Sequence, residues 1–176
     1  MTGVRKIAAH QRLSGFTLLE LLIVCALVGV LASVALGRLW AIQQVAEEAM
    51  AEQVLGALKN GIRIRSAELI TSARWDEFRD LPKTNPFDWL EELPGNYRGE
   101  LKGAGEAGYW YFDKAGGVVS YYVKRSDDFQ SANGALVMRF VVLGLDGAGQ
   151  SRKTPPFAWV GLRPESEYIW LGRVLR

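Results

Sequence analysis

The sequence holds few side chains that can carry out covalent chemistry. Its 176 residues include one histidine, His10, and one cysteine, Cys25. His10 lies in a short basic segment at the start of the chain, and Cys25 lies inside a long apolar run. A serine or cysteine nucleophile needs a base beside it, and structural zinc sites use Cys and His ligands. The sequence therefore predicts no hydrolytic triad, no zinc site and no intramolecular disulfide.

Three aspartates are the candidate metal ligands. Asp127 and Asp128 are adjacent in the sequence, and Asp146 lies in a glycine-rich segment. Carboxylate oxygens are ligands that Ca²⁺ prefers, but these aspartates lack the spacing of a regular calcium loop. We expect solvated turn residues here and no cofactor, with calcium left open as an alternative.

A single acid, Glu20, interrupts the longest apolar segment. Residues 21–37 are 17 consecutive uncharged residues, and residues 16–19 extend the run on the other side of Glu20. As a helix, residues 16–36 span about 30 Å, which is the thickness of a bilayer core. An ionised acid at the centre of a membrane helix costs about 2.5–3.5 kcal/mol, and less near the interface. Glu20 therefore needs a partner of opposite charge.

Basic residues before this segment predict its orientation. Arg5, Lys6 and Arg12 are the only charged residues among the first 15, which places the N-terminus in the cytoplasm and the rest of the chain outside it. Without these three, the remaining 18 basic side chains nearly balance the 19 acidic ones. No basic cluster of the kind that binds nucleic acid is apparent, so we expect no nucleic-acid partner.

Three interpretations of the N-terminal region compete. A secretory signal would be cut at a small-x-small site, and residues 33–35, Ser-Val-Ala, offer one. An uncleaved signal anchor needs no such site. Neither explains why a carboxylate lies four residues after Phe16.

The third interpretation rests on the segment from Ser14 to Glu20, which reads SGFTLLE. Together with the basic leader before it and the apolar run after it, this segment closely resembles the signature of type IV pilins and type II secretion pseudopilins. The resemblance implies that a prepilin peptidase cuts between Gly15 and Phe16 and methylates the new amine of Phe16. It also implies that this ammonium neutralises Glu20 of an adjacent subunit and so sets the register of assembly.

Two glycines in the apolar run fit the same resemblance. Gly29 matches a glycine that is common in the membrane helix of this family, and close helix packing of any kind is the alternative explanation. Gly37 stands where many members have proline. Because glycine permits local unwinding without forcing a kink, melting of the helix on assembly is less strongly implied here.

The helical pattern continues beyond the membrane segment. Residues 43–73 are amphipathic, with apolar side chains at helical spacing and charged ones largely elsewhere. The apolar positions are Leu55, Leu58, Ile62 and Leu69, and the charged ones include Glu47, Glu48, Glu52, Lys59, Arg63 and Glu68. Gly56 and Gly61 weaken the helix. One long helix and a membrane anchor followed by a separate helix both remain open.

Strand patterns dominate the C-terminal part of the chain. We expect a hairpin from residues 108–112 and 118–123, a third strand at 135–143, and shorter strands at 158–162 and 168–174. These strands would form an antiparallel meander of three or four strands whose one face packs on the amphipathic helix.

The sequence predicts an α+β fold, in which a long N-terminal helix packs on a small antiparallel sheet. The expected segments are a leader at 1–15, a membrane and assembly helix at 16–40, an amphipathic helix half at 41–80, a connecting loop at 81–107 and a sheet head at 108–176.

The resemblance implies a structural subunit of a pilus or pseudopilus rather than an enzyme. Its expected partners are prepilin peptidase, other pilin or pseudopilin subunits, an inner-membrane assembly platform and membrane lipid. The missing cysteine pair argues against a major type IVa pilin and favours a minor pilin, a pseudopilin or a mannose-sensitive haemagglutinin-type pilin. The rival is a periplasmic binding or enzymatic domain held by an uncleaved anchor.

Overall fold

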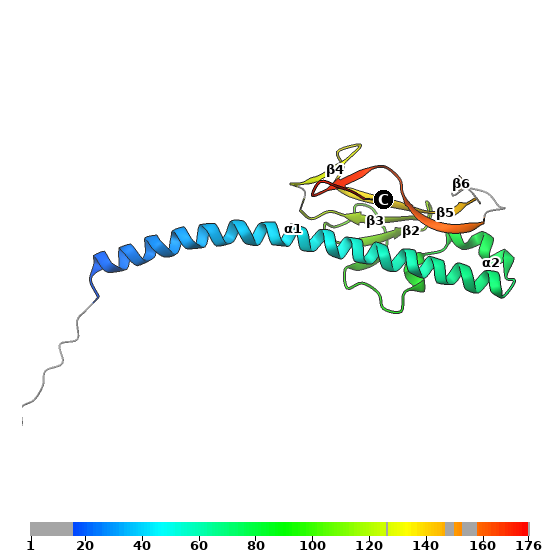
Figure 1. Cartoon of the computed structure of the whole chain (residues 1–176), viewed down its shortest axis with the longest axis horizontal. Helices are drawn as coiled ribbons and strands as arrows, with labels where there is room; N and C mark the ends of the chain where they lie inside the picture. Colours follow the sequence, from blue (N-terminus) through cyan, green and yellow to red (C-terminus); the bar gives the residue numbers. More distant parts are fainter. Residues whose placement is uncertain (1–15, 126, 147–149, 153–157, 176) are drawn as a thin grey trace, which may run out of the picture. The chain divides into compact units, whose positions relative to one another are not determined.

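The computed structural model describes residues 16–125, 127–146, 150–152 and 158–175 (Figure 1). The chain divides into two units, Met1–Ile42 and Gln43–Arg176, which we treat separately. The helix α1, Leu18–Thr71, contributes its first part to one unit and its remainder to the other. We call the second unit the head.

Within the head, α1 packs on strands as its apolar pattern predicts. Leu55, Leu58, Ile62 and Leu69 are buried, because their spacing of three, four and seven residues places them on one face of the helix. They share one hydrophobic core with side chains from the sheets, among them Trp110, Phe112, Val119, Tyr121, Met138, Phe140, Tyr168 and Trp170. Glu47 and Glu48, which the pattern assigned to the polar face, are also buried, at 7% and 4% exposed.

The end of α1 is set by backbone hydrogen bonds. The Arg74 amide donates to the Leu69 carbonyl at 2.9 Å and the Ala73 amide donates to the Ile70 carbonyl at 3.1 Å. This is the pattern of a Schellman motif, whose turning residue is left-handed, and Ala73 has a φ of 52°. The helix therefore stops at Thr71, although the sequence predicted a helical half up to residue 80.

Short elements replace the connecting loop expected at 81–107. A six-residue helix, α2, covers Trp75–Asp80, and two 3₁₀ turns follow at Leu81–Lys83 and Pro86–Trp89. The second turn begins where the Asn85 side chain accepts a hydrogen bond from the Phe87 amide at 3.2 Å. Proline at the first position of such a turn needs no amide partner.

The larger sheet is mixed and has six strands. The hairpin of β2, Trp110–Asp113, and β3, Val118–Tyr122, is antiparallel, as predicted. The sheet order is β1-β2-β3-β5-β6, and β7 also pairs with β5. The remaining strands are β1 Tyr97–Glu100, β5 Val137–Leu145, β6 Ser151–Arg152 and β7 Trp159–Pro164.

One strand of this sheet departs from the predicted meander. β1 lies inside the expected loop and pairs with β2 in parallel, with an irregularity between Tyr97 and Glu100. Positive φ values occur in and after this strand at Gly99, Gly103 and Gly108. They let the chain turn back within a few residues, so that β2 can pair with β1. Because glycine-rich polar segments carry no strand periodicity, β1 could not be predicted from the sequence.

A second sheet has the order β4-β8-β9, with bounds Phe129–Ser131, Tyr168–Trp170 and Arg173–Leu175. The sequence predicted a single strand over 168–174, but Leu171 and Gly172 have φ values of 47° and 77° and reverse the chain. Two consecutive positive φ values make a hairpin turn, and leucine is not a residue that indicates one. Tyr168 on β8 links this sheet to the larger one, because its hydroxyl accepts a hydrogen bond from the Arg139 amide on β5 at 2.9 Å.

The two glycines of α1 in the head differ in their surroundings, which gives a matched test. A Cβ at Gly56 would meet nothing within 4 Å, whereas one at Gly61 would lie 3.3 Å from the Trp89 carbonyl oxygen. Gly56→Ala should therefore raise the free energy of unfolding by about 1 kcal/mol, the usual helix advantage of alanine. Gly61→Ala should gain less or lose stability. Thermal unfolding of both variants checks this, and equal gains would contradict the close packing at Gly61.

Candidate assembly helix and head anchor

Thr17 starts the helix α1. Its side-chain oxygen accepts a hydrogen bond from the Glu20 amide at 3.2 Å, and its carbonyl accepts one from the Leu21 amide at 3.2 Å. A threonine cap followed three residues later by glutamate is the sequence pattern of a capping box. Glu20 in the first turn is also favoured by the helix dipole. Glu20 thus has a local role at the start of the helix, which the sequence analysis did not consider.

The predicted processing site lies at the edge of the described region. Gly15 falls outside it, whereas Phe16 is described and is 65% exposed. Glu20 is exposed as well. Leader cleavage and methylation remain predictions from the sequence.

The first unit exposes a continuous apolar surface. Every described residue from 16 to 42 is exposed, and large apolar side chains such as Leu18 and Leu31 are 82% and 68% exposed. α1 is the one helix among the described residues that is long and apolar enough to cross a membrane. A soluble protein rarely leaves so much apolar surface in water. Lipid or other apolar helices must cover this segment.

Gly29 and Gly37 lie on this exposed segment. A Cβ at either position would meet nothing within 4 Å, and α1 runs through both without interruption. Neither glycine is therefore explained by packing within its own chain. A role in packing against neighbouring helices stays a prediction.

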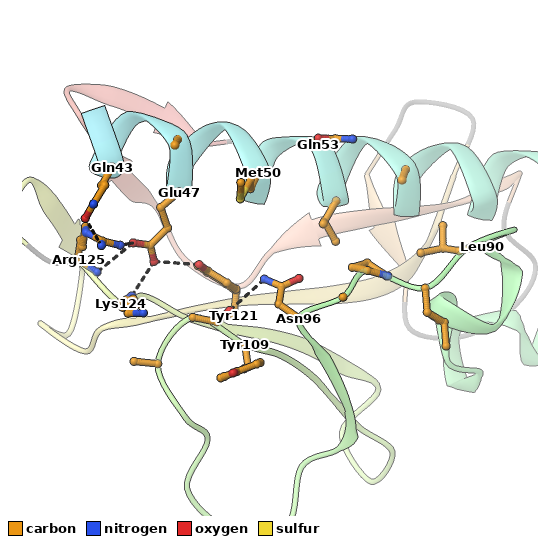
Figure 2. Close-up of a pocket in the computed structure, with 18 of the residues that line it drawn as sticks. Gln43, Glu47, Met50, Gln53, Leu90, Asn96, Tyr109, Tyr121, Lys124 and Arg125 are labelled. Carbon is orange, nitrogen blue, oxygen red and sulfur yellow. Dashed lines mark hydrogen bonds and ion pairs between the residues drawn. The ribbon is translucent and has the colours of Figure 1, made fainter. Parts of the chain in front are cut away.

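In the head, the carboxylate of Glu47 binds the end of strand β3. Its Oε1 accepts from the Tyr121 hydroxyl at 2.9 Å and from the Lys124 amide at 2.7 Å, and its Oε2 accepts from the Arg125 amide at 3.1 Å. The Arg125 guanidinium lies 3.7 Å from Oε2. Figure 2 shows the side chain pointing from α1 toward these donors. A carboxylate that is 7% exposed is thus provided with charge-assisted hydrogen bonds.

Neighbouring residues of α1 extend this contact. Arg125 Nη2 donates to Gln43 Oε1, and Gln44 Nε2 donates to Asp127 Oδ2 at 2.9 Å. We use the term head anchor for Gln43, Gln44, Glu47 and Tyr121 together with the residues that they contact, Lys124, Arg125 and Asp127. It joins the first turn of α1 in the head to the segment that leaves β3.

Burial keeps Tyr121 protonated. Burial raises the pKa of Tyr121 well above its ordinary value, and the hydrogen bond to Glu47 and its negative charge raise it further. Tyr121 therefore remains a hydrogen-bond donor to Glu47 across the physiological pH range.

An open groove of about 830 Å³ lies beside the head anchor. One wall is α1 and another includes Leu90 and Asn96, and Tyr121 and Arg125 also line the groove (Figure 2). Its α1 residues are Gln43, Ala46, Glu47, Met50, Gln53, Val54 and Ala57. The groove combines amide, carboxylate, phenol and apolar side chains, and no histidine or cysteine is among the described residues that line it.

The three candidate calcium ligands accept hydrogen bonds from other residues of the head. Asp127 accepts from Gln44, and the Asp128 carbonyl accepts from the Leu171 amide at 3.1 Å. Asp146 Oδ1 accepts from the Gln150 amide at 2.9 Å. Within the described ranges, no three His, Cys, Asp or Glu side chains form a group that could hold a metal ion.

Comparison with known proteins identifies the N-terminal region. Residues 11–36 match the family described as the prokaryotic N-terminal methylation motif. No curated protein and no solved structure matches the chain. Proteins with this motif are usually structural rather than enzymatic, and the motif with a long apolar helix is consistent with an inner-membrane protein that later enters a filament. The chain therefore carries the N-terminal motif of the type IV pilin and pseudopilin family, on a pilin-like α+β architecture.

Proposed function

We propose that this chain is a structural subunit, a minor pilin or pseudopilin, of a type IV pilus or a type II secretion pseudopilus. Prepilin peptidase removes residues 1–15 and methylates Phe16. The helix from Phe16 then anchors the subunit in the inner membrane and later assembles with the helices of other subunits. The match of residues 11–36 to the methylation motif is the observation that carries this proposal.

The exposed surface of α1 supports both stages of this life cycle. The apolar side chains of residues 16–42 are exposed, so they need lipid before assembly and apolar helices afterwards. An inner-membrane assembly platform would supply the transfer between these two environments. The basic residues before the segment favour a cytoplasmic N-terminus and a periplasmic head.

Glu20 is the proposed register residue. In the membrane its carboxylate needs a cation, and the amine of Phe16 on an adjacent subunit would supply one. Such a pair removes two uncompensated charges from lipid at once.

The subtype proposal rests on the cysteine content. A chain whose only cysteine is Cys25, in the apolar segment, cannot form a disulfide loop within the head. This favours a minor pilin or a pseudopilin, including those of mannose-sensitive haemagglutinin-type systems, over a major type IVa pilin. Proteins with the methylation motif are usually structural, which supports a structural rather than an enzymatic role.

The N-terminus of the mature chain tests this proposal. We expect intact-mass and N-terminal peptide analysis of the membrane-extracted protein to find N-methylated Phe16 as the first residue. A host strain that lacks prepilin peptidase should yield the chain with residues 1–15 attached. A chain that keeps its leader while the peptidase is active would support an uncleaved anchor, and a cut after Ala35 would support an ordinary secretory signal. Either result would overturn the proposal.

A further inference from the structure

Glu48 contrasts with its neighbour Glu47. Both carboxylates lie on the head part of α1 and are less than a tenth exposed. Glu47 accepts three hydrogen bonds, whereas Glu48 Oε1 is buried with no hydrogen-bond partner among the described residues. An ionised carboxylate that loses water without gaining donors is costly, and a neutral carboxyl group costs much less.

We propose that Glu48 is a proton-uptake site that makes the head more stable in mildly acidic surroundings than at neutral pH. The proposal concerns the head itself and holds whether or not the chain enters a filament. It assigns a role to a buried acid that neither the assembly helix nor the head anchor uses.

The charges around Glu48 agree with this role. Burial raises the pKa of Glu48 above its ordinary value of 4.5, and the negative charge of Glu52, one turn further along α1, raises it too. The positive charge of Arg173 on β9 opposes the rise but is outweighed. Glu47, the adjacent acid, is held by Tyr121 and Arg125 on the β3 side.

The direction of the pH dependence follows from the raised pKa. At a pH above the raised pKa, Glu48 is ionised in both the folded and the unfolded chain, and the folded chain carries the full cost of burying the charge. As the pH falls through the raised pKa, the folded chain binds a proton before the unfolded chain does, so stability rises. The gain is complete below pH 4.5, where the unfolded chain is protonated as well.

Other carboxylates lose stabilising contacts in acid, so the test compares variants at each pH. The full mature chain in nonionic detergent is melted between pH 7.5 and pH 4.5 as the parent, E48Q and E52Q. We expect the melting temperature of E48Q to exceed that of the parent at pH 7.5. Each fivefold increase in the folding equilibrium constant corresponds to a rise of about 2–4 °C. This difference should shrink toward zero at pH 4.5. E52Q removes only the repulsion from an exposed acid on the same helix, so it should shift the melting temperature by less than E48Q at pH 7.5.

A second measurement uses the parent chain alone. The carboxyl ¹³C resonance of Glu48 should titrate with a midpoint above the ordinary glutamate pKa of 4.5. An E48Q that is unfolded or less stable than the parent at pH 7.5 would overturn the proposal. A difference that is constant with pH would also overturn it, as would a Glu48 midpoint at or below 4.5.

Discussion

Glu20→Gln is expected to leave leader removal intact and to abolish entry of the chain into a filament. Glutamine keeps the capping-box pattern with Thr17 but removes the charge that the amine of a neighbouring Phe16 would meet. Removing one partner of a buried ion pair costs about 3–5 kcal/mol, so incorporation should fall by roughly 100-fold or more. The measurement is the amount of variant in sheared or cross-linked filaments, relative to processed protein in the membrane.

Thr17→Ala provides the matched control for Glu20. It removes the oxygen that accepts from the Glu20 amide and so weakens the start of α1, by about 1 kcal/mol, while the charge of Glu20 remains. We expect this variant to be incorporated nearly as well as the parent. A Glu20→Gln chain that assembles as well as the parent would remove the register role and leave Glu20 as a capping residue.

Glu47→Gln is expected to lower the free energy of unfolding of the head by about 3 kcal/mol. In the parent, three donors bind the buried Glu47 carboxylate, namely the Tyr121 hydroxyl and the amides of Lys124 and Arg125. An amide group presents one oxygen and a competing donor, so at least one of the three stays unsatisfied and Arg125 loses its counter-charge. The melting temperature should drop by about 6–12 °C, at roughly 2–4 °C per kcal/mol.

The control for Glu47 lies one turn further along the helix. Glu52 is exposed, so Glu52→Gln should change stability by no more than about 0.5 kcal/mol. Tyr121→Phe removes one donor and should cost about 1 kcal/mol. If Glu47→Gln melts within a degree of the parent, the head anchor contributes no net stability, and the contacts at residues 124 and 125 are incidental.

The amphipathic pattern did not predict the burial of Glu47 and Glu48. Two adjacent glutamates on a helix are ordinarily solvated, and the pattern of charges assigned both to the polar face. The structure buries both, one with three donors and one with an unsatisfied oxygen. The donors to Glu47 lie 74 to 78 residues away in the sequence, and two of them are backbone amides, which leave no mark on residue type.

The β2–β3 hairpin could be predicted from the sequence, whereas the hairpin in the second sheet could not. The β2–β3 hairpin was predictable because runs of aromatic and β-branched residues flank a short glycine-containing turn. The β8–β9 turn was not, because Leu171 occupies a left-handed position for which asparagine or glycine is usual. Leu171 packs against the hydrophobic core, and that burial offsets the backbone strain.

The sequence by itself determined the membrane-length helix, the methylation motif, the apolar face of α1 and the central hairpin. Each of these is specified by residues close together in the chain, through hydropathy, helical period or turn chemistry. Only the tertiary structure decided the head anchor, the parallel pairing of β1 and the burial of Glu48. These depend on which distant segments meet, and that choice is made by packing of the whole core rather than by any local preference.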